Sequence, residues 1–342
     1  MGVKKRILLT GASGTVGFEV LKQLILQADQ FEITAFDQKT KNAIKLLSPF
    51  EKQLNVVYGD LTNPEEVAKV CKEQDDVIHL AAIIPPLADE KQELAYAVNV
   101  KGTENLVLGL KKHSPQAFFM YSSSISVYGD RLHTPWINST DVLAPSLEDH
   151  YAVTKIEAEQ LIRNSGLDFC IFRLAAIMGL SNHKPSGIMF HMPLATAMEI
   201  LTPEDTARAF VNAIAHRTSL TGKTYNLGGG ASCRTTYEEF LSQSFKAFGL
   251  GKMDFPTHAF AEKNFHCGYY ADGDELEDLL HFRRDTLEDY FEKLHHSVSP
   301  VKRTLASVFR GTIKSHLLRK SEPFNALLHK DKKMASRFFN EL

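Results

Sequence analysis

Short apolar runs alternate with longer amphipathic stretches over the first 175 residues of the chain. Residues 5–10 form an apolar run that ends in Thr-Gly, and apolar side chains in residues 14–28 recur at the spacing of a helix. The same alternation predicts strands at residues 31–37, 54–59, 77–80, 117–122 and 169–174, separated by helices at residues 42–47, 64–71, 93–112 and 151–164. Strands that alternate with helices predict an α/β fold with a doubly wound parallel sheet.

The pattern changes after Gly179. Residues 180–197 are rich in Pro, His, Met and Gly, which predicts a loop or lid. A helix at 203–216, a strand at 223–227 and a helix at 237–248 follow. We therefore expect three regions, which are a sheet domain at 1–179, a smaller lobe mainly at 180–295 with segments that return to the core, and a C-terminal extension at 296–342.

A glycine-rich turn joins the first predicted strand to the first predicted helix. Residues 10–17 read Thr-Gly-Ala-Ser-Gly-Thr-Val-Gly. Gly11 permits a tight turn, Gly14 lets the backbone approach a pyrophosphate, and Gly17 allows the helix to pack closely on the strand. The positive N-terminus of the helix then faces the phosphates. This strand–turn–helix context predicts a Rossmann-type site for a dinucleotide.

Asp37 indicates which dinucleotide binds. It ends the second strand, 20 residues after Gly17, where a carboxylate accepts hydrogen bonds from the ribose hydroxyls of the adenosine. The same charge repels a 2′-phosphate, which favours NAD over NADP. Lys39 and Lys41 follow closely and can offset that repulsion, so NADP stays open as an alternative.

Tyr151 and Lys155 lie four residues apart on a predicted helix, which places both side chains on one face. A free tyrosine has a pKa of about 10, and a nearby cation lowers that value. Tyr151 can then exchange a proton with a substrate hydroxyl or carbonyl while hydride moves to or from a nicotinamide. The strand at 117–122 leads into a serine run at 122–124, and a hydroxyl from this run can bind the same substrate oxygen.

These motifs resemble those of the extended short-chain dehydrogenase/reductase superfamily and, within it, the NAD-dependent epimerase/dehydratase family. The resemblance runs from about residue 5 to residue 290. It includes further segments at residues 59–61 (Gly-Asp-Leu), 79–82 (His-Leu-Ala-Ala), 99–105 (Asn-Val-Lys-Gly-Thr-Glu-Asn), 172–179 and 204–209. The resemblance implies that Ser124 is the catalytic serine, Tyr151 the acid/base, and Lys155 the ribose-binding modulator.

The resemblance and the motifs together imply an NAD-dependent oxidoreductase or epimerase that transfers a hydride between nicotinamide and a hydroxyl or carbonyl carbon of a small molecule. The family also implies a homodimer through the helices near 93–112 and 151–164. Two alternatives stay open, a nucleotide-sugar 4-epimerase and a non-catalytic NAD(P)-binding regulatory or scaffold protein. The residues expected to contact the cofactor are Gly11, Ser13, Gly14, Thr15, Val16, Gly17, Asp37, Asp60, Leu61, Leu80, Ala81, Ala82, Asn99, Ser122, Tyr151 and Lys155.

The resemblance is weaker at the substrate-binding positions. Ala175 and Ala176 stand where nucleotide-sugar epimerases carry an asparagine that contacts the sugar nucleotide. Ile125 and Ser126 follow Ser124 where dehydratases place an acidic pair, which disfavours dehydration. The expected substrate-side residues are largely apolar and indicate a less polar substrate, and they are residues 83–86, Tyr128, Arg131, Trp136 and residues 189–192.

The composition is that of a globular protein, with 44% hydrophobic and 23% charged residues. No apolar run reaches the roughly 18–20 residues that a membrane-spanning helix needs. The four cysteines are widely spaced and no Cys/His cluster has the spacing of a metal site. We therefore expect no disulfide framework, no metal, and a reducing, cytoplasmic location.

The last 42 residues are basic. They hold ten Lys/Arg and three Asp/Glu, a balance of +7, although the whole chain carries −2. Apolar residues at 301, 305, 309, 313 and 317 follow a helical spacing, which predicts a basic amphipathic helix over 301–320. Such a helix can make peripheral contact with an anionic membrane or pack on the body of the enzyme, and we favour packing. Nucleic-acid binding is not expected, because the rest of the chain is acidic.

Overall fold

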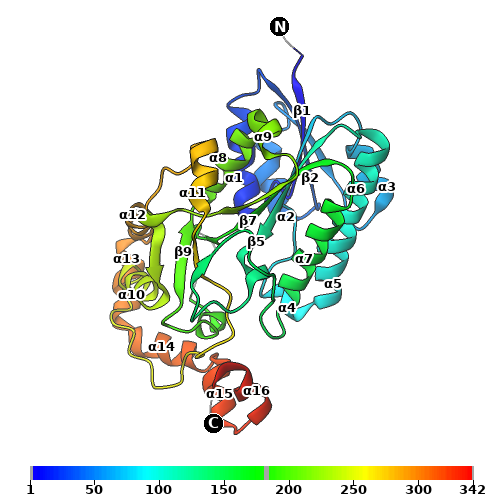
Figure 1. Ribbon diagram of the computed structural model, residues 1–342. Helices are drawn as coiled ribbons and strands as arrows, with labels where there is room; N and C mark the ends of the chain where they lie inside the picture. The colour runs from blue at the N-terminus through cyan, green and yellow to red at the C-terminus, as the bar shows by residue number, and fades with distance from the viewer. Residues whose placement is uncertain (1–2, 181–184, 341–342) are drawn as a thin grey trace.

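A seven-stranded parallel sheet runs through the centre of the computed structural model, which describes residues 3–180 and 185–340 (Figure 1). The strand order is β10-β7-β5-β4-β1-β2-β3. This arrangement confirms the α/β fold with a doubly wound parallel sheet. The strands are β1 (Lys5–Thr10), β2 (Phe31–Asp37), β3 (Asn55–Tyr58), β4 (Asp76–His79), β5 (Phe118–Ser124), β7 (Asp168–Leu174) and β10 (Lys223–Leu227).

Helices cover both faces of this sheet. Ile7 and Leu9 of β1 lie in one apolar cluster, with α1 (Thr15–Ile25) and α8 (Pro203–Ala213). Leu8 points to the opposite cluster, because successive side chains of a strand alternate between its faces. That cluster contains side chains from α3 (Pro64–Val70), α6 (Gly102–His113) and α7 (His150–Arg163), which Figure 1 shows together on the right of the sheet.

The helix predicted at 93–112 contains a wider turn. α5 (Gln92–Tyr96) leads into a π-helical segment, η2 (Ala97–Lys101), which leads into α6. Asn99 lies in this π segment, is buried, and accepts a hydrogen bond at its backbone carbonyl from Thr103 Oγ1 at 2.6 Å. Such π segments occur frequently at functional sites.

A smaller lobe follows β7. Its three-stranded sheet has the order β11-β9-β8, and its core contains Phe and Tyr side chains from α10 (Tyr237–Ala247) and α12 (Leu287–Ser297), together with Met189, Met192 and Met198. α8 and β10 lie between lobe segments in the sequence, yet they pack in the layers of the large sheet. The strands outside the large sheet are β6 (Trp136–Ile137), β8 (Ala176–Ile177), β9 (Ala197–Leu201), β11 (Arg234–Thr236) and β12 (Tyr269–Tyr270).

The loop predicted at 180–197 is described only in part, because residues 181–184 lie outside the described residues. The remainder contains one turn of 3-10 helix, η4 (Gly187–Phe190), and Ala197 already begins β9. The other helices are α2 (Lys41–Leu47), α4 (Leu87–Glu90), α9 (Arg217–Leu220), α11 (Gly273–Leu280), and the short 3-10 turns η1 (Ser48–Phe50), η3 (Ile125–Tyr128), η5 (Ile214–His216) and η6 (Ala231–Cys233).

The prediction of a single C-terminal helix over residues 301–320 is wrong. The segment forms α13 (Pro300–Val308) and α14 (Arg310–Leu318), which meet at Phe309 just before Gly311, a residue with a low propensity for helix. α15 (Glu322–Leu328) and α16 (Lys332–Phe338) follow. α14 packs on the lobe through Ile313, Leu317 and Leu318, as expected, whereas α13 has no buried residue. Among the described residues, no helix combines the length and the apolar character that crossing a membrane requires.

Candidate cofactor and active site

The turn between β1 and α1 has the backbone geometry that its glycines predict. Gly11 has a φ of +72°, and a Cβ there would come within 2.8 Å of the Ala81 nitrogen. A Cβ on Gly17 would lie 2.0 Å from the Gly11 carbonyl oxygen. No side chain caps α1 at Gly14, so the N–H groups of its first turn remain available to an anion.

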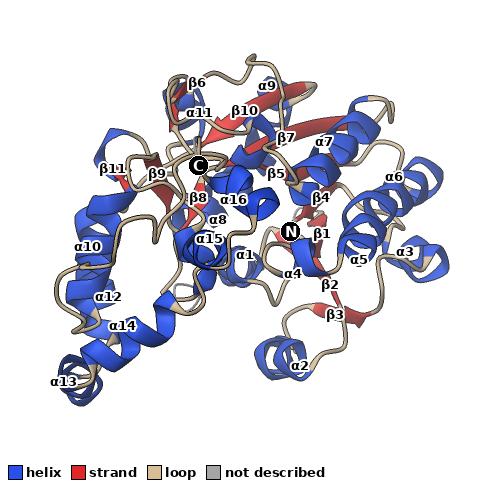
Figure 2. Cartoon of the chain, turned by 90° about the horizontal axis from the view of Figure 1, so that it is seen from below, coloured by secondary structure: helices blue, strands red, loops and turns tan. Residues whose placement is uncertain are grey.

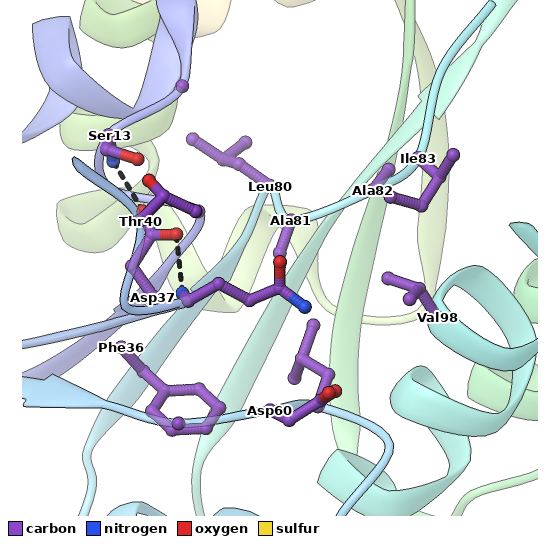
Figure 3. A pocket seen from close by; sticks show the side chains of 15 residues that line it. Ser13, Phe36, Asp37, Thr40, Asp60, Leu80, Ala81, Ala82, Ile83 and Val98 are labelled. Atoms are coloured by element: carbon purple, nitrogen blue, oxygen red, sulfur yellow. Dashed lines mark hydrogen bonds between the residues drawn. The ribbon is translucent and has the colours of Figure 1, made fainter. Parts of the chain in front are cut away.

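A cavity of about 220 Å³ opens at this turn (Figure 3). Its lining comes from the carboxyl ends of β1, β2, β3 and β4, and the strand order reverses between β1 and β4, where open α/β sheets bind ligands. Figure 3 shows the Asp37 carboxylate accepting hydrogen bonds from the backbone N–H groups of Ser13 at 2.6 Å and Gln38 at 2.8 Å. The predicted cofactor residues that line the cavity are Gly11, Ser13, Gly14, Asp37, Asp60, Leu61, Leu80, Ala81 and Ala82.

The other predicted cofactor residues do not line this cavity. They are Thr15, Val16, Gly17, Asn99, Ser122, Tyr151 and Lys155. Four residues that line the cavity were not predicted from the sequence, and they are Phe36, Gln38, Thr40 and Val98. Phe36 and Gln38 flank Asp37 in the sequence, which is a signal that could have found them, whereas Val98 reaches the cavity only through the fold.

The structure brings Ser124, Tyr151 and Lys155 together. Ser124 ends β5, and its hydroxyl lies near enough to the hydroxyl of Tyr151, in the first turn of α7, to lower the pKa of that phenol. Lys155 lies one turn further along α7, and its Nζ donates to the Ser122 carbonyl at 2.7 Å. The same Nζ is 5.7 Å from the centroid of the Tyr151 ring. The three residues therefore form one cluster between a strand end and a helix start.

Burial controls the protonation of this cluster. It raises the pKa of Tyr151 above its usual value, and the hydrogen bond to Ser124 opposes that rise. Burial lowers the pKa of Lys155 to about 7, although the negative charge of Glu159 acts in the opposite direction. At neutral pH the phenol thus holds its proton, while the lysine ammonium is close to its titration point.

Asn99 holds the loop after β4 against the start of α7. Its side chain accepts a hydrogen bond from the Ile83 N–H at 2.8 Å and donates to the Ile83 carbonyl at 2.9 Å. It also donates to Thr154 Oγ1 at 3.0 Å, and that hydroxyl donates to the Tyr151 carbonyl at 2.7 Å. In this structure Asn99 therefore positions the backbone around Tyr151.

A buried ion pair supports the same helix. The Glu159 carboxylate accepts hydrogen bonds from Arg173 Nη2 at 2.8 Å and from Ser123 Oγ at 2.6 Å. Burial would raise the pKa of Glu159, but Arg173 and Ser123 hold it below its usual value. Because Ser123 lies between Ser122 and Ser124, this carboxylate fixes the end of β5 relative to α7.

A buried histidine supports the end of β4. His79 Nδ1 is 2.7 Å from Thr10 Oγ1, and His79 Nε2 is 3.0 Å from Thr103 Oγ1. Thr103 Oγ1 donates to the Asn99 carbonyl, so it accepts from His79, and the ring carries its proton on Nε2. Burial, together with the charge of Lys155, lowers the pKa of His79 to about 3. The residue is a neutral connector between β1, β4 and α6.

A second, larger cavity of about 850 Å³ meets the catalytic cluster at Ser124. Its buried wall is apolar and methionine-rich, and it includes Ala175, Met189, Met192 and Met198. The expected substrate-side residues that line it are Pro85, Pro86, Met189, His191 and Met192.

Other residues expected on the substrate side serve the structure of the protein. Tyr128 is buried, and its hydroxyl donates to Asn226 Oδ1 at 2.7 Å. Arg131 forms an ion pair with Asp141 at 2.6 Å. Trp136 is 53% exposed. Ile83 lines the smaller cavity, and neither Ile84 nor Phe190 lines either cavity.

The sequence analysis missed much of the larger cavity. Its remaining lining comes from distant segments and includes Met178, Tyr237, Phe240, Phe265, His266, Cys267, Lys320, Glu322 and Arg337. These positions carry no local motif, so no signal in the sequence could have assembled them.

Comparisons with known proteins identify a family. The model of the NAD dependent epimerase/dehydratase family matches residues 7–228. A 3-beta-hydroxysteroid dehydrogenase of Mycolicibacterium neoaurum is 28% identical over 207 residues, which are 57% of this chain and 54% of that protein. A D-erythronate dehydrogenase of Haemophilus influenzae is 26% identical over 178 residues, 50% of this chain and 55% of that protein. The chain spans about half the length of these curated relatives.

Solved structures share the fold. A dTDP-glucose 4,6-dehydratase of Bacillus anthracis in complex with NAD has a TM-score of 0.69 at 19% identity, and the match covers 85% of this chain and 96% of that chain. A UDP-glucuronic acid 4-epimerase of Bacillus cereus, in complex with UDP-glucuronic acid and NAD, has a TM-score of 0.68 at 22% identity, covering 85% and 98%.

Proposed function

The chain belongs to the NAD dependent epimerase/dehydratase family, and from this premise we propose that it oxidises or reduces a hydroxyl or carbonyl carbon of a bulky, largely apolar molecule. The observation that carries the proposal is the place of Ser124. This residue interacts with the Tyr151 hydroxyl and lines the cavity of about 850 Å³ whose buried wall is apolar. Proton-transfer groups therefore meet a space that fits an apolar substrate.

The described residues fit NAD, the cofactor of the family. The uncapped start of α1 suits the pyrophosphate, and Gly11 and Gly17 hold the backbone in a conformation that a side chain would block. We assign the adenosine ribose to Asp37 and the adenine to the wall formed by Asp60 and Leu61. NAD supplies a hydride acceptor or, when reduced, a hydride donor.

Tyr151 is the proposed acid/base. Its hydroxyl gives a proton to the substrate oxygen during reduction and takes one during oxidation, while Ser124 Oγ holds that oxygen. Lys155 Nζ lies 5.7 Å from the centroid of the Tyr151 ring, and in its protonated form it would stabilise the phenolate that forms when the proton leaves. Asn99 and Glu159 act indirectly, because they fix α7 and β5 and touch neither reacting oxygen.

The lining of the larger cavity argues against a nucleotide sugar. Ala175 and Ala176 both line it, and its basic residues, Lys320 and Arg337, stand near solvent. A nucleotide diphosphate carries charged phosphates that need basic or N–H partners. The resemblance to the hydroxysteroid dehydrogenase agrees with a bulky apolar alcohol, and we infer that class for this chain.

The test begins with the cofactor state of the purified protein. The protein is purified without added nucleotide and denatured, and the released NAD(H) or NADP(H) is measured by chromatography. We expect an empty protein that binds added NAD and then forms NADH with a 3β-hydroxysteroid as probe substrate. Near-stoichiometric retained NAD would instead favour the internal redox cycle of an epimerase. A protein that binds neither nucleotide would end the proposal.

We also propose a homodimer through α5, α6 and α7. These helices expose the apolar side chains of Leu94, Tyr96, Leu108 and Val153, which a partner subunit could cover. Light scattering should give twice the mass of the chain, and Leu108→Glu combined with Val153→Glu should shift it to the monomer. A monomeric wild-type protein at micromolar concentration would contradict this proposal.

The location and the membrane contact stay proposals. All four cysteines are free thiols, which agrees with a reducing cytoplasm. α13 exposes Val301, Leu305 and Val308 next to Lys302, a pattern that suits peripheral contact with anionic lipid. Co-sedimentation with anionic vesicles at low salt tests this contact, and its absence would leave α13 as a solvent-facing helix.

A further inference from the structure

The end of the chain forms part of the larger cavity. Glu322 at the start of α15 and Arg337 near the end of α16 both line it, together with Lys320. Figure 2 shows α15 and α16 between the lobe helices on the left and α4, α5 and α7 on the right. Residues more than 200 positions apart in the sequence, such as Ser124 and Arg337, therefore enclose one space.

This segment is anchored on one side by backbone and apolar contacts. Ser321 is fully buried and its Oγ donates to the Ala259 carbonyl at 2.7 Å, while the Glu262 N–H donates to the Phe338 carbonyl at 2.8 Å. Phe338 also packs against the His191 ring, with 5.1 Å between ring centroids. The apolar cluster that holds the segment consists of Ala261, Ala326, Ala335, Phe338 and Phe339.

Two salt-bridge contacts tie the segment to the lobe and to the start of α7, the first of them charged on both sides only when His191 is protonated. Glu322 Oε2 is 3.1 Å from Nε2 of His191, which belongs to the lobe. Arg337 Nη1 is 3.3 Å from Oε2 of Glu148, the residue just before the N-cap of α7. Glu322 and Glu148 are both about half exposed, so these pairs hold weakly and can open.

The N-cap of α7 shares this region. Asp149 Oδ1 accepts a hydrogen bond from the Ala152 N–H at 2.9 Å, and Asp149 Oδ2 is 2.8 Å from Nδ1 of His266, a cavity-lining residue. The helix that carries Tyr151 therefore begins at the rim of the cavity, next to the residue that Arg337 contacts. A segment that only stabilised the lobe would not need a contact with the start of α7.

We infer that residues 321–338 form the outer wall of the substrate site and restrict access to its apolar inner surface. The cavity has buried methionines at its inner surface and the more exposed Glu322, Lys320 and Arg337 at this wall. It therefore suits a molecule with an apolar body and a polar outer end. That the occupant of the cavity is a substrate rests on the proposed function, whereas the role of residues 321–338 as a wall of the cavity does not.

Cys267 reports on the wall without any substrate. Its thiol lines the cavity and is 5% exposed, and burial raises its pKa to about 12, so the closed protein should react slowly. Cys71 and Cys170 are fully buried in the layers of the large sheet and serve as internal controls for unfolding. The experiment measures alkylation of each cysteine by N-ethylmaleimide in the full-length protein, with peptide mass spectrometry.

Phe338→Ala should loosen the anchor and raise the alkylation rate of Cys267 roughly tenfold or more, because a large buried contact is lost. Met334→Ala is the matched control, since this side chain lies on the exposed face of α16 and its loss should leave the rate unchanged. An unchanged Cys267 rate in Phe338→Ala, with Cys71 and Cys170 still protected, would overturn the inference.

If Phe338→Ala exposes all three thiols, the variant has unfolded and says nothing specific about the wall. A second variant is then used. Glu322→Gln combined with Arg337→Gln removes both ion pairs at nearly constant volume, and we expect Cys267 to react about two- to threefold faster. Lys332→Gln removes a charge elsewhere on α16 and should have no effect. If the double variant matches the wild type, the wall proposal is wrong.

Steady-state kinetics separate this inference from the proposed function. With a 3β-hydroxysteroid, the double variant should change KM severalfold while the affinity for NAD stays at the wild-type value. A protein that oxidises no alcohol would refute the oxidoreductase proposal, yet the thiol result would still decide whether the C-terminal segment closes the cavity.

Discussion

The nucleotide cavity takes its lining from residues 11 to 98, whereas the substrate cavity takes its lining from residues 85 to 337. The first is built from four consecutive strand ends and depends on backbone conformation, with Gly11 in its lining and Gly17 packed against the Gly11 carbonyl. The second is built from side chains of the sheet domain, the lobe and the C-terminal helices. Cofactor binding is thus a local property of this chain, and substrate binding is a property of its assembly.

The two regions meet at the cluster of Ser124, Tyr151 and Lys155. Tyr151 and Lys155 of this cluster stand on α7, which Asn99 links to the cofactor side and Asp149 links to the substrate side. Substitutions on the cofactor side should therefore change the affinity for NAD, and substitutions on the substrate side should change the reaction of the substrate. Substitutions in the cluster should slow the chemical step and leave both binding affinities nearly unchanged.

The largest effect is expected at Tyr151. Tyr151→Phe removes the proton donor and keeps the ring, so turnover should fall by about 10²–10⁴-fold. The affinity for NAD, measured by calorimetry, should stay within about twofold, because the hydroxyl does not line the nucleotide cavity. Retained turnover would remove Tyr151 from the proposed mechanism.

The next effect is expected at the ion pair that joins β5 to α7. Glu159→Gln leaves Arg173 buried without its carboxylate, which should lower the free energy of unfolding by about 3–5 kcal/mol. Urea denaturation measures the change. Glu157→Gln, two residues earlier on α7, should have little effect, and an equal loss in the two variants would contradict a special role for the pair.

A smaller effect is expected in the nucleotide turn. Gly17→Ala places a Cβ against the Gly11 carbonyl oxygen and should cost about 1–3 kcal/mol of stability while it weakens NAD binding. Gly311→Ala is the matched control, because nothing lies within 4 Å of a Cβ there. This control should be neutral or stabilise α14 by up to about 1 kcal/mol. Unchanged NAD affinity in Gly17→Ala would weaken the contrast between the two cavities.

The smallest effect at neutral pH concerns His79 under the nucleotide cavity. Its folded pKa of about 3 lies below the ordinary histidine value of 6.5, so between these values the unfolded chain binds more protons than the folded one. Stability should therefore fall as the pH falls from 6.5 towards 3, by up to about 1.4 kcal/mol per pH unit from this group. Urea denaturation at several pH values should give a shallower dependence for His79→Gln, and an equal slope would show that His79 does not titrate on unfolding.

The structure of the sheet domain could be predicted from the sequence because each pattern that indicates it spans only a few residues. Strand bounds at Lys5–Thr10, Phe31–Asp37 and Lys223–Leu227 agree with the apolar runs that predicted them. Nine of the predicted cofactor residues line the nucleotide cavity, since each lies at a strand end or in the loop just after one. Asn99 was expected at the cofactor, but it lies in a π segment and bonds to Ile83 and Thr154, a geometry that helical periodicity does not reveal.

The structure of the C-terminal extension could be predicted only in part. Its helical spacing is real, but Phe309 and Gly311 divide the predicted helix, and the halves differ in burial. The spacing of apolar residues shows that one face avoids water, and it does not show what covers that face. The approach of Arg337 to Glu148 therefore has no counterpart in the sequence.

The sequence by itself determined the parallel sheet, the glycine turn, the acidic strand end and the spacing of Tyr151 and Lys155, because each depends on neighbours within one or two elements. Only the tertiary structure decided which side chains line the larger cavity, that Ser124 lies beside Tyr151, and that residues of the last helices reach that cavity. Those contacts join elements separated by tens to hundreds of residues, and the packing of whole layers, which no local pattern encodes, brings them together.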